Sequence, residues 1–207
     1  MSYLLKKIGY AYPSKILSNK EISKRFPEWN VEKIKNKVGI ESRFICDSNE
    51  DSLSLALKAV QDLKIKCNGE LDFDFLIYVS ASSKNIAPSD GHLLLNLMNV
   101  SGSVCCVEIN QGCSGYTHAL GIARSLIKSD SANRILIVTS ETYSKYINHN
   151  DKGNLSIFGD AATTSMVVKN KIEDSWEIKN FKYGSNGNGS QFLNINKKNE
   201  LYMDGGE

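Results

Sequence analysis

Asn110-Gln111-Gly112-Cys113-Ser114-Gly115-Tyr116 is the stretch of this chain that decides its fold. It follows an apolar run, residues 104–109, which is typical of a buried strand. It precedes residues 116–128, where apolar side chains recur at helical spacing. The pattern therefore predicts a cysteine between two glycines, on a sharp turn from a strand into a helix.

Such a turn favours nucleophilic chemistry at Cys113. Glycines permit a backbone course that a side chain would obstruct. The start of a helix offers unpaired N–H groups and positive potential, which favour a thiolate over a thiol. The arrangement parallels the nucleophile elbow of serine hydrolases, with sulfur in place of oxygen. The alternative is a buried structural cysteine, because free cysteines are often buried.

Composition excludes several classes of protein. The chain has 207 residues, is 41% hydrophobic and has a net charge of +2, so neither disorder nor binding of a polyanion is indicated. Its lysines are scattered and no nucleic-acid motif accompanies them, so no nucleic-acid partner is expected. No apolar run approaches the roughly 18–20 residues of a membrane span, and the first residues lack the order of a signal peptide. We therefore expect a cytoplasmic protein without a membrane partner.

The number and spacing of the cysteines argue against disulfides and against a metal site. There are five, with no Cys-x-x-Cys pair and no histidines at metal-ligand spacing, so neither disulfides nor a metal site is expected. Cys105 and Cys106 lie inside the run before the turn, and we expect both to be inert core residues.

Strands and helices alternate along the rest of the chain. Strands are expected at residues 4–10, 73–80, 134–140, 161–169 and 176–183, the last two forming a hairpin. Helices are expected after Ser18, over residues 31–37 and 51–63, and from Pro88 to about Met98. Alternation with near-continuous apolar strands predicts an α/β fold, with a mostly parallel five-stranded sheet flanked by helices.

Several ordered motifs now support a resemblance. The chain resembles the β-ketoacyl-acyl-carrier-protein synthase III family of the thiolase superfamily. The resemblance spans all 207 residues and rests on Val38-Gly39-Ile40-Glu41-Ser42-Arg43, on residues 109–116, on Ser140-Glu141-Thr142-Tyr143-Ser144-Lys145-Tyr146 and on Ile157-Phe158-Gly159-Asp160-Ala161-Ala162. The family reads Gly-Asp-Gly-Ala where this chain has residues 159–162. If the third position needs a positive φ, Ala161 would be strained.

The resemblance implies a two-stage reaction in fatty-acid biosynthesis or a specialised pathway. Cys113 would be acylated by an acyl-CoA and would then pass the acyl group to malonyl-acyl-carrier-protein as carbon dioxide is lost. Ser114 and Gly115 would shape the turn, and Tyr116 would line the pocket. The substrates would be acyl-CoA and the acyl carrier protein, with no cofactor.

The resemblance also implies residues that bind CoA. The resemblance places Arg43 among the residues that bind substrate. Lys37 and Lys152 stand where the family often has arginines, and lysine lacks their planar stacking fork. Trp29 lies ten residues before Gly39, too far to match the family's CoA-stacking tryptophan, so we expect it to pack a helix.

The family completes its site with a histidine and an asparagine from a second, similar half. Residues 1–207 are expected to form the thiolase-like N-terminal half, with the C-terminal half absent, so this chain alone would be inactive in condensation. His92, His118 and His149 are not convincing substitutes. The family is dimeric, so a homodimer is expected. The alternatives are a non-catalytic dimerisation or partner subunit, an inactive fragment of such an enzyme and, more weakly, a cysteine hydrolase.

Overall fold

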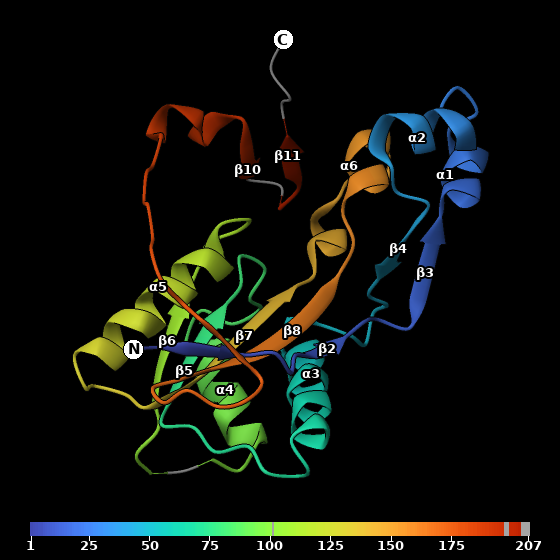
Figure 1. Cartoon of the computed structure of the whole chain (residues 1–207). Coiled ribbons are helices and arrows are strands. Elements are labelled where there is room, and N and C mark those ends of the chain that lie inside the picture. The colour runs from blue at the N-terminus through green and yellow to red at the C-terminus, as the bar shows by residue number, and fades with distance from the viewer. Residues whose placement is uncertain (101, 197–198, 204–207) are drawn as a thin grey trace. The chain divides into compact units, whose positions relative to one another are not determined.

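The computed structural model describes residues 1–100, 102–196 and 199–203, in two compact units (Figure 1). Unit 1 consists of residues 1–12, 50–141 and 161–181. Unit 2 consists of residues 13–49, 142–160 and the described residues from 182 onward. Every helix within these described ranges is too short or too polar to span a bilayer.

Unit 1 is built on one mixed sheet, in the order β6-β5-β7-β8-β1-β9, with β2 also paired to β8. Its strands are β1 (Tyr3–Leu5), β2 (Gly9–Ala11), β5 (Phe75–Val79), β6 (Cys105–Ile109), β7 (Arg134–Glu141), β8 (Ala161–Val168) and β9 (Ser175–Glu177). β5 runs parallel to β6 and β7, whereas the pairs that involve β8 or β1 are antiparallel.

The expected five-stranded, mostly parallel sheet is therefore wrong in strand number and in direction, because the described residues of unit 1 place seven strands in this sheet and most of its pairs are antiparallel. The physical reason lies between β7 and β8. The chain leaves unit 1 after Glu141 and returns at Ala161, and these two residues are direct partners in the sheet. A chain that returns beside the point where it left must run back antiparallel.

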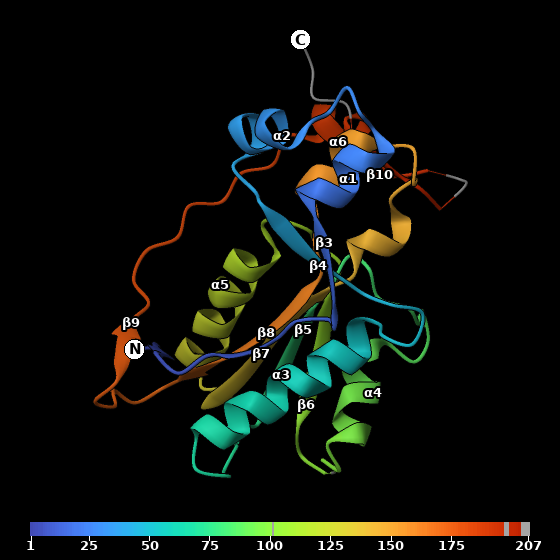
Figure 2. The same ribbon diagram turned by 90° about the vertical axis from the view of Figure 1, so that its right-hand side faces the viewer.

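Helices cover both faces of this sheet, which confirms the α/β class (Figure 2). α3 (Ser52–Lys66) and α4 (Asp90–Leu97) lie on one face, and α5 (Gly115–Lys128) lies on the other. Each face has its own core. The first is built around Tyr78, Leu76, Leu94 and Leu136 and the second around Ile77, Ile135, Ala119 and Ala123. Alternate residues of β5 thus serve opposite layers, as the two-residue period of a strand requires.

Two details at the far edge of the sheet differ from expectation. The strand expected over residues 4–10 is divided into β1 and β2, with Lys6 and Lys7 between them. The expected hairpin of residues 161–169 and 176–183 does not form, because β1 lies between β8 and β9 and pairs with both.

Unit 2 packs short helices around two-stranded pairs. Its elements are β3 (Lys15–Ser18), α1 (Asn19–Arg25), α2 (Val31–Val38), β4 (Ser42–Ile45), η1 (Tyr143–Tyr146), α6 (Lys152–Ile157), η2 (Gly187–Gln191), β10 (Leu193–Ile195) and β11 (Leu201–Met203). Ser18 and Glu21 form the expected capping box of α1. Gly39 ends α2 in the left-handed conformation with a φ of 73°. Trp29 and Ile34 are buried in the core of this unit.

Candidate functional site

Cys113 lies on a turn at the carboxyl end of the parallel strands. β6 ends at Ile109, α5 begins at Gly115, and Ser114 is the residue that caps the helix. The Gly115 N–H donates to the Gly112 carbonyl at 2.9 Å, which closes the turn. The Cys113 side chain is exposed. The expected strand–turn–helix is confirmed, and it presents the thiol to solvent beside the first turn of a fourteen-residue helix.

The glycine after the cysteine has a steric role. A Cβ at Gly115 would lie 2.5 Å from Cγ1 of Val79, the last residue of β5. That is about 1 Å inside an ordinary carbon–carbon contact. The φ of Gly115 is not positive, so close approach of helix and strand explains the glycine here. The start of α5 is therefore held against the end of β5.

The loop that follows β5 lies at the same edge of the sheet. The Ser80 N–H donates to the Ile109 carbonyl at 3.1 Å, which extends the pairing of β5 and β6 up to the nucleophile turn. Glu141, the last residue of β7, accepts from the Ala81 N–H at 2.9 Å and from the Ser82 hydroxyl at 2.6 Å. The ends of three neighbouring parallel strands thus meet around the turn that bears Cys113, as is usual for sites in α/β proteins.

Two more carboxylates fix this loop. Asp90 is fully buried and accepts from the Asn85 amide at 2.7 Å and from the Lys84 N–H at 3.2 Å. Glu108 accepts from the Ser83 hydroxyl at 2.7 Å and from the Gly91 N–H at 3.0 Å.

These acidic residues were missed in the sequence, although each lies in or beside an apolar run. Burial, together with the nearby Asp90, raises the pKa of the Tyr78 phenol.

The other residues expected on the turn lie close to it. Tyr116 is half-buried in the first turn of α5, and its hydroxyl lies 3.2 Å from Oγ of Ser165 on β8. His118 donates from Nδ1 to the Ser114 carbonyl at 2.9 Å, which ties its ring to its own helix. That His118 does not serve as the base for Cys113 stays a prediction.

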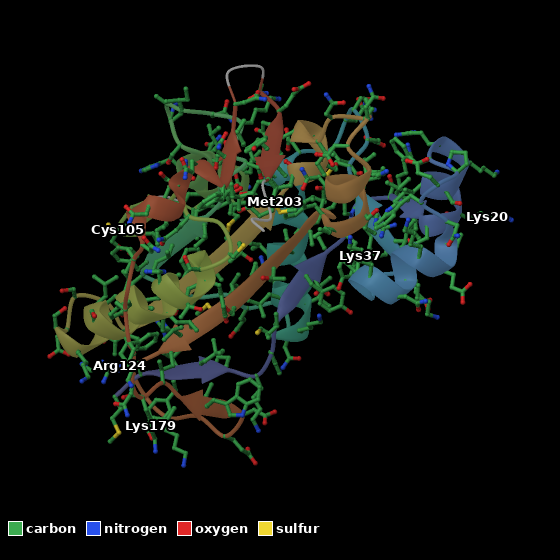
Figure 3. All side chains as sticks on the ribbon, turned by 90° about the horizontal axis from the view of Figure 1, so that it is seen from above. Lys20, Lys37, Cys105, Arg124, Lys179 and Met203 are labelled. Atoms are coloured by element: carbon green, nitrogen blue, oxygen red, sulfur yellow. The ribbon has the colours of Figure 1, made fainter. Side chains whose placement is uncertain are left out.

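Cys105 differs from expectation, whereas Cys106 packs against the core of unit 1. Cys105 is exposed on β6, the edge strand of the sheet, and is not a core residue (Figure 3). Its side chain is exposed because α5, the helix on that face of the sheet, packs chiefly on β5, β7 and β8. Cys106 points to the other face and is partly buried. Burial, assisted by Glu108, raises the pKa of the Cys106 thiol to about 11.

The structure brings Lys37 and Lys152 to one cleft in unit 2, of about 680 Å³, which Trp29 and Tyr202 also line. The ammonium of Lys37 lies 5.5 Å from the centre of the Trp29 ring, within cation–π range. Lys152 forms a 2.7 Å ion pair with Glu28, which lowers the pKa of that carboxyl through the hydrogen bond. Trp29 is 9% exposed and donates to Ser156, so it packs the helices as expected.

Arg43 is buried, at 5% exposure, inside unit 2. Its guanidinium donates to the Leu17 carbonyl at 3.1 Å, to Oδ1 of Asn19 at 2.9 Å and to the Ser156 carbonyl at 2.7 Å. These bonds join β3, α1 and α6, and burial lowers the pKa of the guanidinium. The surroundings of Arg43 thus favour a structural role over a contact with substrate.

The Gly-Asp-Ala-Ala segment is unstrained. Ala161 begins β8 and is not among the described residues with positive φ. Alanine therefore replaces the family's second glycine at this position without backbone strain. Asp160 accepts from the Cys46 N–H at 2.7 Å and the Ser144 N–H at 2.9 Å, and also from the Ser144 hydroxyl. This carboxylate therefore ties β4 to η1.

Comparison with known proteins points to one family. Residues 107–187 match the family model described as 3-oxoacyl-[acyl-carrier-protein (ACP)] synthase III. The chain is 34% identical, over 86% of its length, to a β-ketoacyl-[acyl-carrier-protein] synthase III of Staphylococcus epidermidis, and it spans 54% of that protein. It is 29% identical, over 97% of its length, to the corresponding enzyme of Listeria innocua, of which it spans 63%.

The likeness extends to three dimensions. A crystal structure of a 3-oxoacyl-(acyl-carrier-protein) synthase III matches 99% of this chain with a TM-score of 0.91 at 26% identity. The match covers 68% of that chain. The described fold is thus a thiolase-like α/β fold of the kind seen in the N-terminal part of that enzyme, and the chain spans little more than half the length of its curated relatives.

Proposed function

We propose that this chain, a homologue of β-ketoacyl-acyl-carrier-protein synthase III that spans its N-terminal portion, supplies the nucleophile of an acyl-transferring condensing enzyme. The observation that carries the proposal is the exposed Cys113 thiol on a tight turn, between the end of a parallel strand and the start of α5. The helix start stabilises negative charge there.

In the first stage the Cys113 thiolate attacks the carbonyl carbon of an acyl-CoA thioester. The developing oxyanion accepts from the Cys113 backbone N–H, the carbonyl re-forms, and the CoA thiolate leaves. Gly115 and Ser114 shape the turn, and Tyr116 lines the pocket beside it. Packing of Gly115 on Val79 holds the sulfur at a defined position, which supports this role.

In the second stage malonyl-acyl-carrier-protein loses carbon dioxide. Its carbanion attacks the acyl-cysteine, and the Cys113 thiolate leaves as the β-ketoacyl product forms. This stage needs the histidine and asparagine that the family's C-terminal half supplies. We therefore expect the chain by itself to accept an acyl group and not to condense it.

Lys37 and Lys152 bind the phosphate-bearing part of CoA in this proposal. Their position in one cleft with Trp29 supports it. Glu28 competes with a phosphate for Lys152, because the two side chains already form an ion pair. Glu28→Gln should tighten acyl-CoA binding a few-fold, and Lys152→Met should weaken it. The matched control is Glu41→Gln, which removes the exposed partner of Lys35. Unchanged affinity in both cleft variants would remove these lysines from the CoA site.

A homodimer is supported by two exposed features of unit 1. β6 is an edge strand with Cys105 and Val107 exposed, and an unpaired edge can accept a strand from a second chain. Ile86 is fully exposed at the loop held by Glu141 and Asp90. Light scattering should give twice the mass of the chain, whereas a monomer at micromolar concentration would refute the dimer.

The second candidate is a non-catalytic partner subunit of such an enzyme. Its support is that the family's histidine and asparagine come from a second half, outside the portion of the curated relatives that this chain matches.

Release of free CoA in a single turnover separates the two candidates. Acyl transfer predicts one equivalent of CoA from the wild-type chain and from Cys105→Ser, and none from Cys113→Ser. No release from any of the three would favour the partner subunit.

A further inference from the structure

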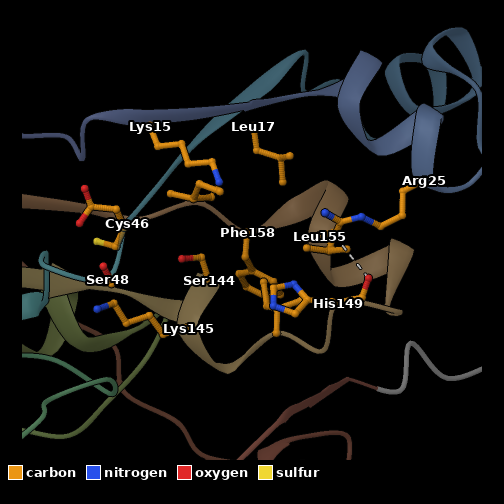
Figure 4. Close-up of a pocket in the computed structure, with 13 residues that line it drawn as sticks. Lys15, Leu17, Arg25, Cys46, Ser48, Ser144, Lys145, His149, Leu155 and Phe158 are labelled. Atoms are coloured by element: carbon orange, nitrogen blue, oxygen red, sulfur yellow. Dashed lines mark hydrogen bonds between the residues drawn. The ribbon is translucent and has the colours of Figure 1, made fainter.

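Unit 2 contains a second pocket, of about 510 Å³, which none of the proposed steps uses (Figure 4). Its walls come from β3, the end of α1, the segment after β4, η1 and α6. All of its lining residues belong to unit 2. Its size lies within the range of small-molecule sites, roughly 300–1,000 Å³.

The floor of the pocket is apolar. Leu17 and Leu155 are each 8% exposed and belong to the core of unit 2, against which Phe158 also packs. Figure 4 shows these three side chains in the middle of the pocket. A hydrocarbon group that covers this floor would be removed from water, and the free energy gained is proportional to the apolar area covered.

The rim of the pocket is cationic. Lys15 and Arg25 reach toward the floor from opposite sides, and His149 lies below them in the same view (Figure 4). Neither Lys15 nor Arg25 forms a salt bridge with any residue that the structure describes. The Arg25 guanidinium donates to the His149 carbonyl at 3.5 Å. Two strong cations are thus available to a ligand.

The β4 side of the pocket lies next to Lys15, which pairs with Ile45 in the β3–β4 ladder. The backbone N–H groups of Cys46 and Ser144 on this side already donate to the Asp160 carboxylate. Asp47 also lines the pocket and would repel an anion, whereas Lys145 would attract one. A negatively charged head group is therefore favoured over the floor, between Lys15 and Arg25.

We propose that this pocket binds a small amphipathic anion. Its carboxylate or phosphate head lies between Lys15 and Arg25, and its hydrocarbon body covers Leu17, Leu155 and Phe158. Guanidinium and ammonium groups recognise both kinds of head through charge-assisted hydrogen bonds. Binding here requires neither Cys113 nor the Lys37 cleft, so it is independent of the proposed acyl transfer.

Isothermal titration with ten-carbon probes tests the proposal. The probes are decanoate and decyl phosphate, and decanol and decyltrimethylammonium are the uncharged and cationic controls. We expect both anions to bind with one-to-one stoichiometry, decanol to bind at least about tenfold more weakly, and the cation to show no binding. The tighter of the two anions identifies the head group. Equal affinity for decanol and decanoate would overturn the proposal.

Variants locate the site. Lys15→Met and Arg25→Met should each weaken anion binding about tenfold. Lys20→Met, an exposed change on α1 outside the pocket, should leave it unchanged (Figure 3). Cys113→Ala should also leave it unchanged, which separates this site from an acyl pocket. Matching circular dichroism spectra establish that each variant is folded. Full affinity in both cation variants would refute the site.

Discussion

Gly115→Ala is the most informative single substitution in unit 1. The added Cβ would lie 2.5 Å from Cγ1 of Val79, so either the turn or the end of β5 must move by about 1 Å. Overpacking of this kind costs about 1–3 kcal/mol in the free energy of unfolding. The higher helix propensity of alanine offsets at most about 1 kcal/mol. We expect a net loss of roughly 1–2 kcal/mol, together with a changed rate of alkylation at Cys113.

Val79→Ala provides the matching partner change, because it removes the atom that the new Cβ would meet. The next neighbours, Cβ of Gln111 at 3.6 Å and Cβ of residue 79 at 3.9 Å, are at ordinary contact distances. In the Val79→Ala background, Gly115→Ala should therefore be neutral or slightly stabilising. Urea unfolding of both single variants and the double variant should give a coupling energy of about 1–3 kcal/mol.

Gly184→Ala serves as a control, because a Cβ there would have no neighbour within 4 Å. It should change the free energy of unfolding by no more than about 0.5 kcal/mol. The reasoning would be refuted if the effects of Gly115→Ala and Val79→Ala added to within about 0.5 kcal/mol. The glycine would then have a role other than close packing on β5.

Three further predictions concern buried polar groups. Arg43→Met leaves the oxygens of Leu17, Asn19 and Ser156 without their donor. It should lower the free energy of unfolding, measured by urea unfolding, by about 3 kcal/mol, and a loss below about 1 kcal/mol would contradict a structural role. Glu141→Leu removes both carboxylate oxygens that accept from the loop and should speed hydrogen exchange of the Ala81 amide; unchanged exchange would exclude Glu141 as the anchor. Burial raises the pKa of the folded Cys106 thiol to about 11, above the roughly 8.5 of an unfolded thiol, so the thiol ionises first in the unfolded chain. The free energy of unfolding should therefore fall as the pH rises from about 8.5 to about 11, and it should fall less steeply in Cys106→Ala.

The nucleophile turn was predictable because its signal is local. A strand-like run, a glycine-flanked cysteine and a helical period lie next to one another in the sequence. The reason for Gly115 was not predictable, because it depends on Val79, which is distant in sequence. The approach of Lys37 to Lys152 could be expected from the resemblance to a family and not from the spacing of the two lysines, which are on different helices.

The sheet was harder to predict because strand order depends on non-local pairing. The position of β1 between β8 and β9 brings together the two ends of unit 1. The burial of a strand likewise depends on its neighbours. The run that contains Cys105 is apolar enough for a core strand, yet it forms the edge of the sheet. The bonds of Asp90 and Glu108 to backbone N–H groups are tertiary contacts that carry no periodic signal.

The central claim is that Cys113 accepts an acyl group. The intact mass of the chain after incubation with acetyl-CoA and longer acyl-CoAs tests it most directly, with peptide mapping to locate any adduct. We predict an added mass of one acyl group on the peptide that contains Cys113, absent from Cys113→Ala and retained in Cys105→Ala. An unmodified chain, or an adduct that persists in Cys113→Ala, would contradict the claim.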